Sequence, residues 1–466
     1  MIFIQNPPTY LPERSYIYDV ILHDFLGQDY RACPDEGQAV RIRLAEDPSG
    51  RELIMPDILF QTPKAKWLTE AALPKRPLRR WEIPEKVRAT NRLFDHIPVL
   101  FANEEKQDIL YKETSQGISL GLDVFGGAFW ALTRYEEFVL PTKDEHGRFP
   151  IHASLAFQES FLERPVINEY LEILWASFEH LWPLLQRKAR KARVFLSHDV
   201  DIPLCAAGRS RASVYRSVLV DIVIRHDIDL ALRRRKAYQE AKKNIFDNDP
   251  CNTFELIMDT SDKQSRQSEF NFICEPAAGE MVGNYDLGSP WFRKLLRRIH
   301  ERGHVVGLHP SYMSWEKPGQ VQQEYRKLRK ICREEKIEQD KWGGRQHYLR
   351  WNNPHSWQYW ETAGLNFDST LGFAEQAGFR CGVCFEYPVF NLVTRQTLKL
   401  RERPLIAMDV TLFPGWRFDF KMCFEKIITM NSICRFFKGD FTLLWHNSSL
   451  LTKVQRDLFR QVNENL

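Results

Sequence analysis

The sequence predicts an α/β protein in which a smaller mixed α/β domain precedes a larger repeating region. In residues 191–466, short apolar runs that end in a polar residue alternate with segments of helical periodicity. Alternating strands and helices produce parallel strands joined by right-handed crossovers, so this half predicts a (β/α) barrel. Residues 1–190 show mixed patterns without this repeat, and their role cannot be inferred from any motif.

Composition excludes several classes of protein. The 466 residues are 43% apolar and include 13 Trp, which is enough for large buried cores, and the net charge of +4 is too small for a dedicated nucleic-acid binder. The nine cysteines are scattered and odd in number, as in reduced cytoplasmic proteins. Residues 1–8 lack the basic start of a signal peptide, and no apolar run approaches the roughly 20 residues that span a bilayer. We therefore expect a cytoplasmic protein.

One helix is well marked in the first domain. Apolar residues recur at helical spacing over 123–138, which predicts an amphipathic helix. The charged residues Arg134, Glu136 and Glu137 lie near its end. We expect them to form a solvated, ion-paired tip rather than a functional site.

The second half opens with the apolar run 194–201, which ends in Asp199 and Asp201. It predicts a buried strand, and because side chains alternate along a strand, both carboxylates should project from one face at its carboxyl end. Two carboxylates in one pocket either share a proton or hold a cation. The alternative is a solvated loop in which an Asp caps the next helix. These residues alone leave both interpretations open.

A basic helical insertion is predicted at about 205–250. Val214, Val218 and Ile222 suggest one apolar helical stripe, and residues 233–236 are four consecutive basic residues. The simpler interpretation is a solvated excursion from the fold. A second hypothesis is that this segment contacts phosphates or an anionic membrane surface near the site.

The rest of the chain repeats one pattern of elements. A strand is predicted over 253–258. Ser289 and Pro290 then begin a helix that Gly303 ends, as N-cap, first-turn and C-cap residues do. Further helices are expected over 320–336 and before Gly364, and further strand candidates are 304–309, 365–368, 404–409 and 441–446.

Polar residues end several of these predicted strands, so they should meet at one rim of the barrel. They are Asp199, Asp201, His309, Arg345, His347, Asp409 and His446. A lone histidine is more often structural, but several histidines that face paired carboxylates favour a catalytic or metal site. His304 lies an odd number of residues before His309 and should face the other way, into the core.

Four motifs, in this order, resemble those of the polysaccharide deacetylases, the carbohydrate esterase family 4 with its NodB-homology domain. They are Ser-His-Asp-Val-Asp (197–201), Gly-His-Val-Val-Gly-Leu-His (303–309), Arg-Gln-His-Tyr (345–348) and Leu-Leu-Trp-His (443–446). The resemblance runs from about residue 193 to the C-terminus and implies a distorted (β/α) barrel. The first half, with Leu-Thr-Arg-Tyr-Glu-Glu (132–137), is similar to an uncharacterised domain that often precedes such deacetylases in surface-polysaccharide synthesis.

The resemblance implies catalytic roles for five residues. Asp199 would be the catalytic base, and Arg345 would orient it. His446 would be the general acid, with Asp409 raising its basicity. The backbone N–H near Tyr348 would help to hold the oxyanion.

The resemblance also implies a divalent metal site, with zinc as the expected ion. Asp201 and His309 match two of the ligands. The third is usually a histidine four residues later, but this position is Met313, whose thioether is a poor zinc ligand. Either His347 completes the set, where the family usually has proline, or the metal is weakly bound or absent. We favour His347 because the two replacements offset each other.

The expected function is therefore metal-dependent removal of an N-acetyl group from a sugar intermediate of surface-polysaccharide synthesis. The substrate would be nucleotide-linked or lipid-linked, and no nucleic-acid partner is expected. One alternative is a catalytically impaired sugar-binding or scaffold protein, which Met313 supports. The other is a metal-independent amide hydrolase of the same superfamily.

Overall fold

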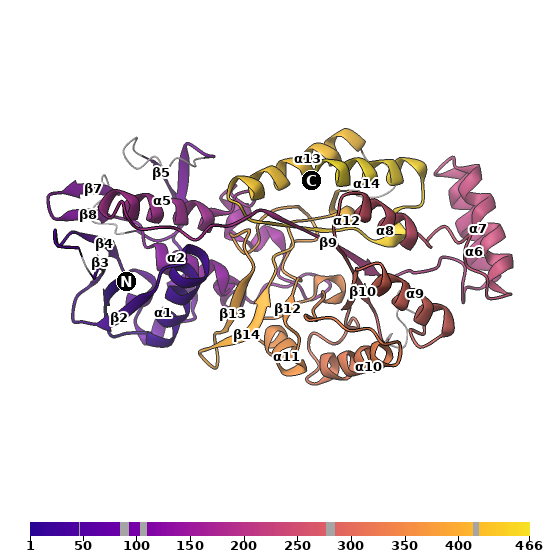
Figure 1. Cartoon of the computed structure of the whole chain (residues 1–466), viewed down its shortest axis with the longest axis horizontal. Helices are drawn as coiled ribbons and strands as arrows, with labels where there is room; N and C mark the ends of the chain where they lie inside the picture. The colour runs from indigo at the N-terminus through magenta and orange to yellow at the C-terminus, as the bar shows by residue number, and fades with distance from the viewer. Residues whose placement is uncertain (46, 84–92, 103–109, 276–284, 413–418) are drawn as a thin grey trace.

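The chain has a mixed α/β fold with several separate sheets. The computed structural model describes residues 1–45, 47–83, 93–102, 110–275, 285–412 and 419–466. In Figure 1 the N-terminal segment lies at one end of an elongated molecule, and a helical hairpin lies at the other. No helix in the described residues is long and apolar enough to cross a lipid bilayer.

The N-terminal half is built on a six-stranded sheet of order β2-β1-β3-β4-β8-β7. Its strands are β1 (Ile2–Asn6), β2 (Tyr30–Pro34), β3 (Ala39–Leu44), β4 (Glu52–Pro56), β7 (Tyr111–Thr114) and β8 (Gly117–Leu120), and β5 (Arg79–Glu82) pairs separately with β6 (His96–Val99). The helices are α1 (Leu11–Tyr18), a π-helical turn over 19–26, α2 (Val124–Leu132), α3 (Tyr135–Val139), α4 (Leu155–Gln158) and α5 (Val166–Leu181). Helix α5 packs on β4 and β8 and buries one face of the sheet.

The predicted solvated tip of the 123–138 helix is wrong. The helix breaks at Arg134, which has a left-handed φ of 52°, and α3 begins at the next residue. Arg134, Glu136 and Glu137 are only 2%, 3% and 5% exposed. Arg134 donates to both carboxylates, and Arg380 of the C-terminal half donates to Glu137 at 2.6 Å. The cluster is buried because the second half of the chain covers it.

The C-terminal half contains a five-stranded parallel sheet of order β11-β10-β9-β16-β15. Its strands are β9 (Arg193–Val200), β10 (Ser268–Phe272), β11 (Val305–Leu308), β15 (Ala407–Met408) and β16 (Asp440–Leu444). Helices α8 (Phe254–Lys263), α9 (Pro290–Glu301) and α13 (Phe420–Phe436) pack on β10, β11 and β16. The remaining elements are α6 (Arg211–Val223), α7 (Ile228–Ala241), α10 (Gln320–Glu334), α11 (His355–Ala363), α12 (Asp409–Leu412), α14 (Lys453–Asn465) and a small sheet of β12 (Phe367–Asp368), β14 (Gln396–Glu402) and β13 (Tyr387–Asn391).

The strand predicted over 253–258 is wrong, because these residues begin helix α8. Their buried apolar residues, Phe254, Ile257 and Met258, follow the helical spacing i, i+3, i+4. The strand that follows β9 is β10, and all five of its residues are buried although Glu269 and Asn271 are polar. The predicted helix after Ser289 and the strand before His309 are confirmed as α9 and β11.

The predicted closed barrel is not confirmed. The regular strands of the sheet end at β11 and β15 within the described part of the chain. Three segments are linked to β11, to one another and to β16 by backbone hydrogen bonds: residues 342–345, residues 366–371 with β12, and residues 401–406, which begin with the end of β14. The segments therefore lie between β11 and β16, but they are not strands of the five-stranded sheet.

Candidate active site

The carboxyl ends of the parallel strands bring the predicted site residues together, as the alternating strand and helix pattern indicated. Asp199 lies near the end of β9 and Asp201 follows it, whereas His309 follows β11 and Asp409 follows β15. Arg345, His347 and Tyr348 belong to the irregular segment beside β11, and His446 follows β16. Ion-pair contacts join seven of these side chains into one cluster: Asp199, Asp201, His309, Arg345, His347, Asp409 and His446.

Asp199 is buried and fixed by two donors. Its Oδ1 accepts hydrogen bonds from Arg345 Nη1 at 3.0 Å and from Asn271 Nδ2 at 2.8 Å. Burial alone would raise the pKa of this carboxyl, but the charge of Arg345, followed by that of His309, holds the pKa below its ordinary value. Asp199 is therefore a carboxylate that can accept a proton.

Asn271 is a site residue that the sequence analysis missed. It lies on β10 directly opposite Asp199 of β9. Gly307 of β11 is the neighbour on the other side, and a Cβ at this position would overlap the side-chain oxygen of Asn271. The glycine of the second motif therefore leaves room for the amide that holds Asp199. A correct placement of β10 would have revealed Asn271, because it is a polar residue inside a buried strand.

The site contains a group of residues that could hold a metal ion: Asp201, His309 and His347. Each offers one ligand atom, and these atoms lie within 4.8 Å of one another. Asp201 Oδ1 is 3.2 Å from His309 Nε2 and 3.6 Å from His347 Nε2. His309 Nδ1 donates to the carbonyl of Arg345 at 2.6 Å, so Nε2 points toward the carboxylate. A carboxylate oxygen and a ring nitrogen this close need a positive charge between them, either a proton on His309 or a metal ion.

The donor set fits a divalent metal ion. One carboxylate and two imidazoles are typical ligands of catalytic zinc, and a backbone carbonyl commonly orients such a histidine. Asp201 Oδ1 is buried and accepts no well-formed hydrogen bond from any group in the described residues. Burial lowers the pKa of His347 to about 4, so its ring is neutral, as a metal ligand must be.

Met313 contacts Arg350. Its sulfur is 3.5 Å from Arg350 Nη1, and the Arg350 guanidinium lies over the rings of Tyr312 and Trp315. The structure thus places His347 beside Asp201 and His309, and the Met313 sulfur beside Arg350. The role of His347 as a ligand remains a prediction.

His446 and Asp409 form a tight pair. His446 Nδ1 is 2.7 Å from Asp409 Oδ1, and the backbone N–H of His446 donates to Asp409 Oδ2 at 3.0 Å. Burial would lower the pKa of the imidazole, but the Asp409 carboxylate raises it to about 10. His446 is therefore protonated at neutral pH, and its Nε2 lies 3.7 Å from Asp201 Oδ2. A protonated imidazole beside the ligand cluster can serve as a general acid.

Tyr348 forms part of the wall of the site together with residues of the N-terminal half. It has a left-handed backbone, with φ 59° and ψ 17°, and its ring packs against Tyr312 and His146. His146 Nδ1 is 3.0 Å from the Tyr312 hydroxyl, and Arg148 donates to the carbonyl of Tyr348. No motif marks His146, so the sequence analysis missed it. The predicted oxyanion role of the Tyr348 N–H remains a prediction.

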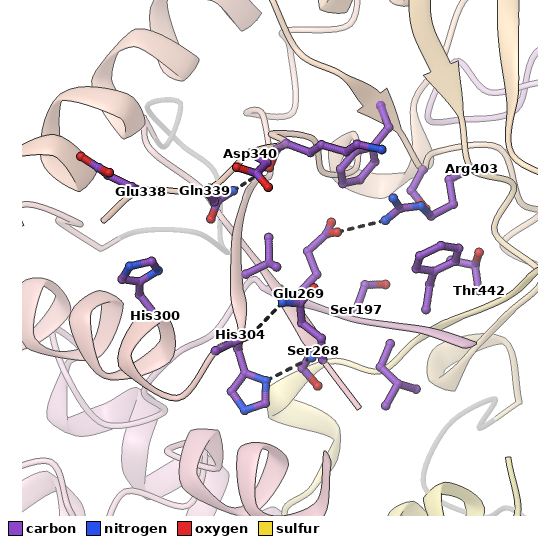
Figure 2. Close-up of a pocket in the computed structure, with 18 residues that line it drawn as sticks. Ser197, Ser268, Glu269, His300, His304, Glu338, Gln339, Asp340, Arg403 and Thr442 are labelled. Atoms are coloured by element: carbon purple, nitrogen blue, oxygen red, sulfur yellow. Dashed lines mark hydrogen bonds and ion pairs between the residues drawn. The ribbon is translucent and has the colours of Figure 1, made fainter. Parts of the chain in front are cut away.

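A separate cavity of about 510 Å³ lies toward the amino-terminal ends of the same strands. Figure 2 shows Glu269 and Arg403 paired inside it, at 3.4 Å, with His304 beside Ser268. His304 is only 3% exposed, so the prediction that it lies in the core is confirmed. None of the predicted site residues lines this cavity.

The comparisons with known proteins give little more than the sequence motifs. Residues 2–183 match the model of a family of unknown function, DUF7033. No curated protein matches the chain. A solved structure described as a putative polysaccharide deacetylase from Mycobacterium smegmatis is 13% identical and covers 59% of this chain and 85% of that chain, with a TM-score of 0.38. So distant a similarity supports no functional argument, and the function must be inferred from the site.

Proposed function

We propose that this chain is a metal-dependent hydrolase that removes an N-acetyl group from a sugar. One observation carries the proposal, which is that three kinds of group lie together at the carboxyl ends of the strands. They are the carboxylate of Asp199 held by arginine, the cluster of one carboxylate and two imidazoles, and the protonated His446. The motif resemblance supports the same reaction. We also infer that the hydrogen-bonded segments beside β11 complete a distorted (β/α) barrel.

The proposed reaction needs a base at the attacking water. A divalent ion bound by Asp201, His309 and His347 would lower the pKa of a water molecule and polarise the amide carbonyl. Asp199 would accept the proton of that water as the oxygen attacks the carbonyl carbon. The Arg345 guanidinium keeps Asp199 ionised and fixes its orientation, because it is fully buried and donates directly to the carboxylate.

The second half of the reaction needs an acid at the leaving nitrogen. The C–N bond breaks productively only if the amine receives a proton, and His446 would supply it. Asp409 keeps this proton available because it raises the pKa of His446. The products would be acetate and a free amino sugar. The side chains of Asp201 and His446 are 20% and 12% exposed, so a substrate can reach them.

The substrate class rests on the resemblance and on the expected cytoplasmic location. A cytoplasmic step of surface-polysaccharide synthesis would act on a nucleotide-linked or lipid-linked N-acetylated sugar. The experiment must therefore test the reaction with both forms of substrate.

Acetate release from a panel of N-acetylated nucleotide sugars and lipid-linked sugars, with the zinc-loaded chain, tests the proposal. Loss of the base or acid typically costs about 10²–10⁴ in rate, so Asp199→Asn and His446→Gln should both be severely impaired. Asp340→Asn, at the opposite cavity, is the matched control and should retain activity. Release that survives both Asp199→Asn and chelation would refute the proposal and favour a metal-independent hydrolase.

A further inference from the structure

The insertion after β9 folds into a helical hairpin of α6 and α7 (Figure 1). Asp221 is completely buried between the helices and pairs with Arg234 at 2.6 Å and with Arg225. Leu230, Arg234 and Ala237 of α7 are buried as well. The hairpin therefore has its own buried interior. Arg234, which belongs to the basic run 233–236, is part of that interior.

The outer surface of the hairpin is unusually apolar. The described residues include 18 exposed large hydrophobic side chains. Seven of them lie within the short range 215–232. They are Tyr215, Leu219, Ile222, Val223, Ile224, Ile228 and Leu232. The four residues on α6 follow the spacing i, i+4, i+7, i+8, which places them on one face of the helix. Clustered exposure of this kind marks an interaction surface.

The position of this stripe differs from the sequence expectation. Of the three predicted stripe residues, Val214 is 2% exposed and faces the interior, Val218 is half-buried, and Ile222 is 41% exposed. The exposed stripe is therefore offset around the helix from the predicted one. It is most exposed near the hairpin tip, where Val223 and Ile228 reach 64% and 65%.

The hairpin is also strongly basic. Residues 209–243 contain ten Arg and Lys against four Asp and Glu, a net charge of +6, whereas the whole chain carries +4. The rest of the chain is therefore slightly acidic. Arg211, Arg216, Arg235 and Lys236 are exposed. An apolar stripe flanked by exposed cations is the pattern of helices that lie in the interface of an anionic membrane.

We propose that the α6–α7 hairpin docks on an anionic lipid surface, with its apolar stripe among the acyl chains and its cations at the headgroups. A second copy of this chain is disfavoured as the occupant, because two surfaces of charge +6 would meet. Helix α6 begins ten residues after Asp201, so docking would tether the candidate site to the membrane through this short connection. The inference does not depend on the proposed reaction, because it concerns binding alone.

Co-sedimentation of the full chain with vesicles tests this inference. We expect binding to vesicles of mixed phosphatidylglycerol and phosphatidylcholine at low salt, and weak binding to pure phosphatidylcholine. Each basic residue near an anionic surface contributes about 1 kcal/mol, so Arg216→Gln, Arg235→Gln and Lys236→Gln together should weaken binding on the order of 100-fold. Arg234 is left unchanged because it is part of the hairpin interior.

A second set of variants removes the apolar stripe while keeping the charge. Leu219→Ser, Val223→Ser and Leu232→Ser should weaken binding by at least about tenfold through lost apolar burial. Leu184→Ser and Val393→Ser are controls, because these apolar side chains are 95% and 59% exposed outside the hairpin and their replacement should not change binding. Thermal unfolding of each variant establishes that it is folded.

Several results would overturn the proposal. These are absence of vesicle binding by the parent chain, equal binding to neutral and anionic vesicles, or binding that survives both sets of changes. If millimolar inorganic phosphate displaces the chain from vesicles as effectively as added competitor vesicles do, the cations bind free phosphate instead. Dimerisation that the serine variants abolish, without vesicle binding, would assign the stripe to a second copy.

Discussion

Replacement of Asp409 by asparagine should remove the proton from His446 at neutral pH. Asp409 is fully buried, and its two carboxylate oxygens bind the imidazole Nδ1 at 2.7 Å and the backbone N–H of His446 at 3.0 Å. Asparagine keeps the size and one acceptor but removes the charge. Because only the charges of Asp201 and Asp199 then oppose the effect of burial, the pKa of the imidazole in the variant should fall well below that of the parent.

The structure gives the size of this effect. The pKa of His446 is raised from 6.5 to about 10, and each pKa unit corresponds to about 1.4 kcal/mol, so the surroundings favour the imidazolium by roughly 5 kcal/mol. At about pH 8 nearly every His446 is protonated in the parent, and a much smaller fraction should be protonated in Asp409→Asn.

The same shift predicts a pH dependence of stability. A raised pKa in the folded state means that the contribution of His446 is fully present below pH 6.5 and is lost as the pH rises through about 10. The difference in free energy of unfolding between parent and Asp409→Asn should therefore be at its full size around pH 6 and shrink as the pH rises toward about 10. Urea denaturation across this range measures it.

Imidazole NMR titration of the metal-free chain is the direct assay, with His446→Gln to assign the signal. Asp262→Asn is the matched control, since Asp262 lies 3.3 Å from the distant His304 and should leave the His446 titration unchanged. A parent His446 that titrates near its ordinary pKa, or one unaffected by Asp409→Asn, would refute the reasoning.

Three further outcomes follow from the contacts described above. Gly307→Ala should destabilise the chain by about 1–3 kcal/mol in urea denaturation, because the added methyl overlaps Asn271; full stability would contradict this packing. Arg380→Met leaves the buried Glu137 with one partner fewer, and urea denaturation should show a loss of about 3–5 kcal/mol; a neutral result would show that the pair is dispensable. Arg345→Lys should lower kcat for acetate release more than it raises KM, because a lysine cannot reproduce the guanidinium contacts; unchanged kcat would exclude a positioning role.

The sequence predicted the rim of the site well because local signals marked it. Strand β9 is an apolar run that ends in carboxylates, and His309 and His446 follow buried strands of the same kind. Parallel strands bring these ends together, so locating the strands before Asp199, His309 and His446 was enough to place these residues in one cluster. The motifs also singled out His347, which the structure places beside Asp201 and His309.

The errors arose where tertiary contacts determine burial. Strand β10 was missed because it lacks an apolar pattern: its polar residues Glu269 and Asn271 are buried and contact Arg403 and Asp199, respectively. The charged residues around Arg134 were expected in solvent, but the second half of the chain covers them. His146 joins the site from a distant segment, and a single sequence carries no signal for such a contact.

The metal content of the purified chain tests the central claim most directly. After zinc loading and desalting, mass spectrometry of the metal should find about one zinc per parent chain, as expected for a site of three protein ligands. Met313→Leu should retain this zinc, whereas His309→Ala and His347→Ala should lose it. A parent without zinc, or zinc that depends on Met313 and not on His347, would contradict the account.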